Sequence, residues 1–230
     1  MNNCRITRLS KLFIALLVSY SVSVSQAAEI LVNSDVIDQA MDVVNQKYQA
    51  SEGFRSQYFL DLPLVSETAT LQNTYVFKYF TELFENNISS ASIFLRSSTS
   101  LKDENIKLSE RINIPSNRLR GFESGKVGPK DGNDFIGGNY AATINFTSSI
   151  PQILENSENI DFLVFFDAGN VWGVDYFDGD DEGSEVRSST GVAVDWLTPV
   201  GPLNFTLALP ISKSDSDKTE TFRFNIGTSF

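Results

Sequence analysis

The residues best suited to a specific interaction are an arginine in a long polar segment and aspartates in apolar surroundings. The arginine is Arg120, within the sequence RLRGFE (118–123). Its guanidinium group is a planar fork of N–H donors that can bind both oxygens of a carboxylate. The candidate acceptors are Asp161 and Asp167 in IDFLVFFDAG and Asp195 in TGVAVDWL. These residue types would allow an arginine–carboxylate pair, which is a structural element and not a catalytic group; the alternative is an exposed loop arginine without a partner.

Other kinds of site chemistry are poorly represented. The chain has no histidine, the commonest general base and transition-metal ligand, which excludes the usual Ser/His hydrolase machinery. Its single cysteine, Cys4, lies in a segment that we expect to be removed. The acidic run DYFDGDDEGSE (175–185) lacks the ligand spacing of a twelve-residue Ca²⁺ loop and is interpreted as a solvated loop. We therefore expect no catalytic residues, no metal site and no cofactor.

The overall charge excludes one class of partner. The formal net charge is −11, and no stretch of the chain forms a basic stripe. Nucleic-acid binding relies on such a stripe to meet the phosphates. We therefore expect no nucleic-acid partner.

The N-terminus has the pattern of a secretory signal. Basic residues without acids precede the apolar run LFIALLVSYSVSV, and small residues at Ser25 and Ala27 follow it. The run is too short to span a bilayer, so we expect a signal peptide over 1–27, cleaved after Ala27. Residues 28–53 are expected to form a periplasmic segment, with a helix within SDVIDQAMDVVNQKYQA (34–50).

From Phe54 onward, apolar residues recur at every second position, which is the period of a β-strand. In IDFLVFFDAG, for example, Ile160, Phe162, Val164 and Phe166 share one face and Asp167 lies on the other. Such alternation fits a soluble sandwich with one wet face or a membrane barrel with a polar lumen. The segments span about 9–12 residues and their polar face is small, which favours the transmembrane barrel.

We count eight strands and predict an antiparallel outer-membrane β-barrel over 54–230. The predicted strands are 54–65, 70–84, 87–100, 137–150, 159–169, 188–198, 202–210 and 221–230. Barrels of this class have an even number of strands, short periplasmic turns and longer external loops. A periplasmic C-terminus makes the polar connections at 101–136, 170–187 and 211–220 external.

Several separated motifs resemble one known family. They are RLRGFE (118–123), GPKDGNDFIGGN (128–139), VFFDAGNVW (164–172), VDWLTPVGPLNF (194–205) and the terminal FNIGTSF (224–230). In this order they resemble the C-terminal barrel half of the BamA-type outer-membrane assembly factors, in the bacterial surface antigen family. The resemblance implies a fold of sixteen strands preceded by periplasmic repeats, and a role in inserting or secreting outer-membrane proteins. This sequence shows only half of those strands and none of the repeats.

The same resemblance implies a role for the opening arginine. Family members carry the RGF motif on an external loop that folds back into the lumen, where its arginine pairs with the acid of an FxDAG-like motif. In this sequence these residues are Arg120 and Asp167, with Asp195 or Asp161 as secondary partners. Gly121 would let the backbone turn sharply, and Leu119 and Phe122 would pack against the lumen wall.

The last strand resembles the signal by which outer-membrane barrels are recognised for assembly. The signal residues are Phe222, Phe224, Ile226 and Phe230. We expect a protein of the Gram-negative outer membrane that assists the assembly of other outer-membrane proteins. The alternative is a structural barrel without insertase activity, closed on itself or paired with a second copy. The expected partners are outer-membrane lipid, nascent outer-membrane proteins, assembly lipoproteins and a second copy of the chain.

Overall fold

A computed structural model describes residues 53–63, 70–102, 104–151, 159–175, 185–199 and 201–227. The predicted signal peptide, the helix expected at 34–50 and the terminal Phe230 lie outside these ranges. Within them, no helix is long and apolar enough to cross a membrane.

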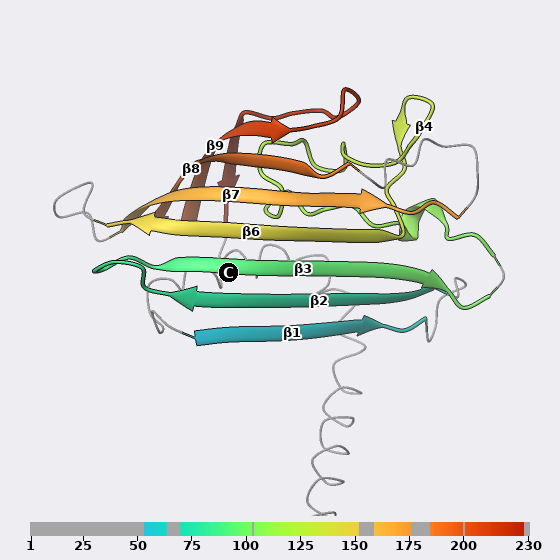
Figure 1. Cartoon of the computed structure of the whole chain (residues 1–230), viewed down its shortest axis with the longest axis horizontal. Helices are drawn as coiled ribbons and strands as arrows, with labels where there is room; N and C mark the ends of the chain where they lie inside the picture. The colour runs from blue at the N-terminus through green and yellow to red at the C-terminus, as the bar shows by residue number, and fades with distance from the viewer. Residues whose placement is uncertain are drawn as a thin grey trace, which may run out of the picture. The chain divides into compact units, whose positions relative to one another are not determined.

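The fold is an eight-stranded antiparallel sheet, which confirms the predicted all-β antiparallel class and the number of strands in the sheet (Figure 1). Its strands, in spatial order, are β1 (Gly53–Asp61), β2 (Thr70–Thr81), β3 (Ser89–Ser100), β6 (Tyr140–Ile150), β7 (Ile160–Trp172), β8 (Arg187–Thr198), β9 (Gly201–Ser212) and β10 (Phe222–Ile226). Each strand pairs with its sequence neighbour, except that β3 pairs with β6 across the long connection. That connection contains the two short strands β4 and β5.

Most strand boundaries differ from the predicted ones by one to four residues, and two of these differences have clear reasons. β1 ends at Asp61 instead of residue 65, two residues before Pro63, which has no N–H to donate to a ladder. β7 continues to Trp172 instead of residue 169, because Tyr140 pairs with Trp172 in register and their rings stack with centroids 5.9 Å apart.

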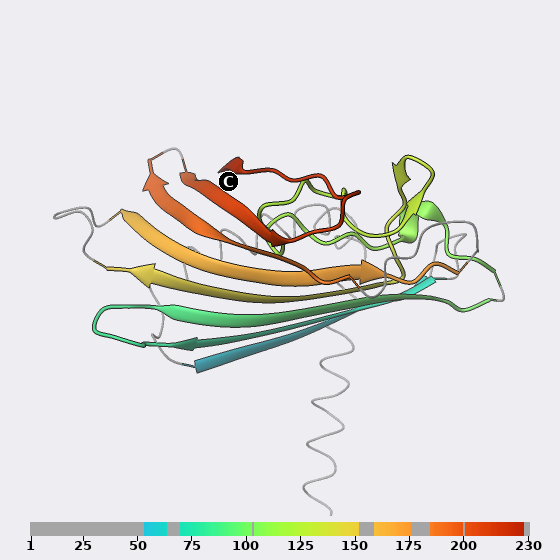
Figure 2. The ribbon, with the colours of Figure 1, turned by 45° about the horizontal axis from the view of Figure 1, so that its top comes forward.

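The prediction of a barrel agrees with the structure in the antiparallel sheet, but the described residues do not show the sheet closing on itself. β1 and β10 stand at the two ends of the strand order, and no pairing joins them within the described residues. The sheet curves, and the connection between β3 and β6 lies along its concave side (Figure 2).

The two faces of the sheet differ sharply in polarity, as the two-residue period requires. Large apolar side chains project from the convex face and are 36–64% exposed. They include Tyr75, Tyr79, Ile93, Leu95, Ile144, Phe146, Val164, Phe166, Val192, Trp196, Leu207 and Leu209. The concave face carries small and polar side chains, among them Thr143, Asn145, Ser189 and Thr206. So dense an array of exposed apolar residues marks a surface built for contact with lipid or protein.

The connection from β3 to β6 is ordered and partly regular, although its sequence indicates only a loop. It contains a short 3-10 helix, η2 (Leu108–Glu110), and a two-residue hairpin of β4 (Lys130–Asp131) and β5 (Asp134–Phe135). Its apolar side chains pack with residues of the concave face. The resulting buried cluster contains Val76, Phe94, Ile112, Ile114, Leu119, Phe122, Val127, Ala141 and Val171.

Candidate functional site: a loop arginine on the concave face

The strand register builds a row of polar side chains across the middle of the concave face. Ser92 on β3 pairs with Asn145 on β6, Asn145 pairs with Asp167 on β7, and Asp167 pairs with Ser189 on β8. Residues directly opposite each other on neighbouring strands lie side by side on the same face. Four separate strands therefore place four short polar groups in one line, with a carboxylate near its centre.

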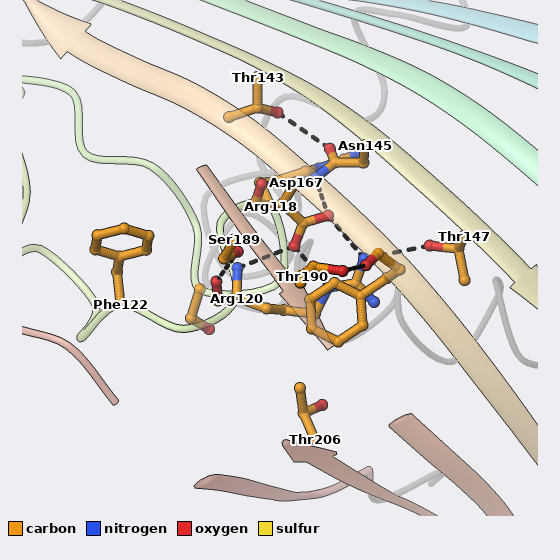
Figure 3. Close-up of polar contacts among 12 residues, drawn as sticks. Arg118, Arg120, Phe122, Thr143, Asn145, Thr147, Asp167, Ser189, Thr190 and Thr206 are labelled. Carbon is orange, nitrogen blue, oxygen red and sulfur yellow. Dashed lines mark hydrogen bonds and ion pairs between the residues drawn. The ribbon is translucent and has the colours of Figure 1, made fainter. Parts of the chain in front are cut away.

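The loop brings Arg120 to this carboxylate. Arg120 Nε lies 2.7 Å from Asp167 Oδ2, and Arg120 Nη2 lies 2.7 Å from Asp167 Oδ1, so the pair is bidentate (Figure 3). The Asp167 side chain is 0% exposed and that of Arg120 is 15% exposed. A buried carboxylate without a partner is strongly unfavourable, so this guanidinium is essential to the local structure.

Asp167 has its full set of hydrogen bonds. Besides the two guanidinium bonds, it accepts one from the Arg120 backbone N–H at 3.1 Å and one from Asn145 Nδ2 at 2.8 Å. A carboxylate has about four acceptor positions, and all are used here. Asn145 also donates to the Arg118 carbonyl at 2.7 Å, and the Ser189 hydroxyl donates to the Arg120 carbonyl. The strands therefore hold the backbone of the loop as well as its side chain.

The Arg120 guanidinium also rests on an aromatic ring. Its central carbon lies 3.6 Å from the ring centroid of Phe165, two residues before Asp167 on the same face of β7. Arg120 Nη2 donates to the Thr147 hydroxyl at 3.2 Å. Stacking of this kind contributes about 0.5–2 kcal/mol, more where water is excluded. A lysine could supply the charge here, but not the planar stacking or the double hydrogen bond.

The neighbours of Arg120 shape the loop as expected of their residue types. Gly121 adopts φ of +91°, in the left-handed region that glycine enters most readily. Leu119 and Phe122 are 3% and 1% exposed and belong to the cluster between the loop and the sheet. Phe122 points away from the ion pair (Figure 3). The apolar residues and the ion pair thus fasten the loop at separate points.

Asp195 and Asp161 are not among the partners of Arg120. They face each other across β7 and β8, six residues along β7 from Asp167, and Asp195 accepts a hydrogen bond from Asn204. Six residues of strand span roughly 20 Å, which exceeds the reach of the arginine side chain. The sequence pattern identified the face of these aspartates but not their distance from the loop.

The described residues of the predicted C-terminal signal lie on the convex side. Phe222, Phe224 and Ile226 are 54%, 43% and 59% exposed, and Phe224 stacks on Phe205 with centroids 4.8 Å apart. Arg223, between them, points to the concave side and donates to the Ser116 and Phe122 carbonyls at 2.6 and 2.8 Å. The last strand is therefore fastened to the same loop that carries Arg120.

The sequence reasoning missed a second buried ion pair. Arg187, at the start of β8, donates from Nε and Nη2 to the Asp217 carboxylate at 2.9 and 3.2 Å, and both side chains are 0% exposed. Arg187 also donates to Asn170 Oδ1 at 2.5 Å. The sequence does contain one relevant signal, which is an arginine at the boundary of a predicted strand. An arginine buried at such a position requires a nearby acid.

The arrangement fastens a loop and offers no reactive centre. The acceptor positions of Asp167 are taken by Arg120 and Asn145, and no group of histidine, cysteine or acidic residues in the described part of the chain could hold a metal ion. Asp175, at the start of the acidic run, pairs with Arg111 at 2.7 Å. The rest of the run lies outside the described ranges.

Comparison with known proteins agrees with this geometry. The family described as the Omp85 superfamily domain matches residues 37–230. The outer membrane protein assembly factor BamA of Neisseria meningitidis serogroup B is 31% identical over 139 residues, covering 49% of this chain and 17% of that protein. BamA of Neorickettsia risticii is 29% identical over 117 residues, covering 50% of this chain and 16% of that protein.

A solved structure shows the same relationship in three dimensions. The crystal structure of Haemophilus ducreyi BamA lacking POTRA domains 1–3 matches with a TM-score of 0.68 and 28% identity. The match covers 80% of this chain and 40% of that one. The chain thus spans about a sixth of the length of the curated relatives that it matches.

Proposed function

Because the chain belongs to the Omp85 superfamily, we propose that it is an outer-membrane β-barrel protein that assists the folding and insertion of other outer-membrane proteins. The observation that carries the proposal is the loop held on the concave face by Arg120 and Asp167. The loop lies on the concave face of a sheet whose convex face exposes a band of apolar side chains suited to contact with lipid. The relatives are named as assembly factors, not enzymes, which agrees with the prediction that the chain is not an enzyme.

The mechanism that fits this function uses the strand edges. An edge strand presents unpaired N–H and C=O groups, with which an incoming extended chain can pair. β1 and β10 are the two edges of the described sheet. The partners of the proposed function are outer-membrane lipid on the convex face, nascent outer-membrane proteins at the edges, and assembly lipoproteins. Its location is the outer membrane, after removal of residues 1–27.

The proposal is tested in liposomes. The purified chain is reconstituted into liposomes, and a urea-unfolded outer-membrane barrel protein is added. Folding of the added protein is followed by its mobility shift in gel electrophoresis of unheated samples. We expect folding several-fold faster than in liposomes that contain an unrelated barrel of similar size at equal density. Equal rates would overturn the assembly function. Separation of the inner and outer membranes of an expressing Gram-negative host checks the location independently.

The second candidate is a structural outer-membrane barrel without insertase activity. One observation favours it: the described part of the loop packs closely against the concave face, so protein occupies the space over this part of the sheet. This candidate predicts a chain in the outer-membrane fraction that does not accelerate folding in the liposome assay. The two measurements together distinguish the candidates.

A further inference from the structure

The concave face of the sheet holds more than an eight-stranded barrel can enclose. Neighbouring strands lie about 4.8 Å apart and tilt by about 40° in a barrel, which gives a backbone radius of about 8 Å for eight strands. Stacked backbone layers need about 10 Å between them, and an interior of this size is filled by side chains alone. Here the interior must also hold the backbone of the β3–β6 connection and its β4–β5 hairpin.

The contacts of that connection show that it belongs on the concave face. Ile112 and Phe122 are 1% exposed and pack in one cluster with Val76 of β2 and Val171 of β7. Arg120 reaches β7, and Arg223 of β10 donates to two carbonyls of the loop. Because these contacts extend from β2 to β10, the sheet cannot close around its own interior without expelling the loop. A wall that encloses the loop therefore needs more strands than the eight of the described sheet.

Both edges of the sheet are shaped to continue it. On β1, Phe54 and Tyr58 are 75% and 61% exposed on the convex side, while Arg55 and Gln57 are half-buried. β10 alternates in the same way. Neither edge strand contains a proline, one of the devices by which proteins block edge pairing, and the outward-facing side chains of both are uncharged. Each edge carries one inward-facing arginine, Arg55 on β1 and Arg223 on β10, and Arg223 is already bound to the loop.

We propose that a second copy of this chain supplies the missing strands, so that β10 of each copy pairs with β1 of the other in a closed barrel of two chains. The strands alternate in direction through an order of eight, so β1 and β10 run antiparallel to each other. A two-fold axis along the barrel therefore joins β10 to β1 antiparallel at both seams and leaves no open edge. Twice eight strands give a radius of about 16 Å, enough for one loop from each copy.

This inference rests on the outer-membrane barrel of the proposed function and deepens it by naming a partner and its interface. Gln57 and Asn225 face inward at the two edges, and neither side chain takes part in a described hydrogen bond, so both positions suit substitution. In a Cys4→Ser background, Asn225→Cys is introduced into a chain with one tag. Arg55→Cys, Gln57→Cys and Phe59→Cys are introduced separately into a co-expressed chain with another tag. These three inward-facing positions of β1 test three successive registers of the seam.

Oxidation in membranes with copper phenanthroline reports on the seam. We expect at least one of the three combinations to give a disulfide-linked band that carries both tags. Ile144→Cys, on the convex face in the middle of the sheet, is the control and should give no linked band with Asn225→Cys. Light scattering in mild detergent should give a protein mass of two chains.

Two results would overturn the proposal. A mass of one chain, with an intrachain disulfide in the Gln57→Cys/Asn225→Cys variant, would mean that the barrel closes alone. A second, different protein linked to Asn225→Cys in place of the tagged copy would mean a mixed barrel. Absence of the chain from the outer membrane would instead count against the proposed function, so the two failures are distinguishable.

Discussion

Two arginine–aspartate pairs fasten the loops of this protein to its sheet, and they do so in opposite directions. In the first pair the loop supplies the cation, Arg120, and the strand supplies the anion, Asp167. In the second pair the strand supplies the cation, Arg187, and the loop supplies the anion, Asp217. The two strands, β7 and β8, are neighbours, the fifth and sixth of the eight in spatial order. The same chemistry therefore fixes two different loops over neighbouring strands.

The pairs differ in their surroundings. Arg120 keeps 15% of its side chain exposed, whereas Arg187 and Asp217 have none. The two loops also pair with each other: Phe122 forms a β-bridge with Thr219, and the Glu220 N–H donates to the Gly121 carbonyl at 3.0 Å. We expect a larger loss of stability from substitution in the more deeply buried pair. Because the two loops contact each other, a substitution in one pair should also weaken the packing around the other.

The largest effect is expected from Arg187→Ala. The substitution leaves Asp217 buried without its cation, which typically costs about 3–5 kcal/mol. The free energy of unfolding, measured by urea titration in detergent micelles, should fall by that amount. Lys213→Ala, at an exposed position at the start of the same loop, is the control and should change little. An unchanged midpoint for Arg187→Ala would mean that water already reaches Asp217.

Arg120→Ala should follow, with a loss of about 3 kcal/mol, because the partly exposed site lets water solvate Asp167 in part. Arg120→Asp should be worse, because it places two carboxylates together. The double variant Arg120→Asp/Asp167→Arg should recover part of that loss in the same titration. A double variant no more stable than Arg120→Asp would show that the charge pair is not the source of stability.

Gly121→Ala tests the backbone that carries Arg120. A Cβ at this position would lie 3.2 Å from the Cβ atoms of Ala208 and Ser189, at a φ of +91°. Strain of this kind costs about 1–3 kcal/mol. The control is Gly132→Ala, which also has a positive φ, +59°, but no atom within 4 Å of the added Cβ. Equal losses for the two variants would mean that the close packing against β8 and β9 contributes nothing.

Glu185→Gln should have the smallest effect. Its carboxylate lies 4.0 Å from Arg187 Nη2 and is 52% exposed. Exposed pairs contribute about 0–1 kcal/mol. A change in the unfolding midpoint comparable with that of Arg187→Ala would contradict the view that Asp217 is the effective partner of Arg187.

Much of the sheet could be predicted, because its signal is local. Alternation in IDFLVFFDAG is enough to place Asp167 opposite Phe166 and on the polar face. The same period gave eight strands in the observed order. The family resemblance, not the pattern, indicated which loop arginine meets Asp167.

The contacts between the loops and the sheet could not be predicted in this way, because they join residues far apart in the chain. Alternation could not separate Asp167 from Asp195, since both lie on the concave face but at different levels of the sheet. It gave no sign of the bond from Arg223 to Ser116, which spans 107 positions. The β4–β5 hairpin is only two residues per strand, too short for a periodic signal.

The sequence by itself thus determined which side chains face outward and which face inward, because a two-residue period depends only on neighbouring positions in one strand. The tertiary structure decided which inward-facing groups meet the loops: Asp167 with Arg120, and Arg187 with Asp217. The physical reason is that strand register and the path of a long loop are set by contacts between distant segments, and these contacts leave no periodic trace in the chain.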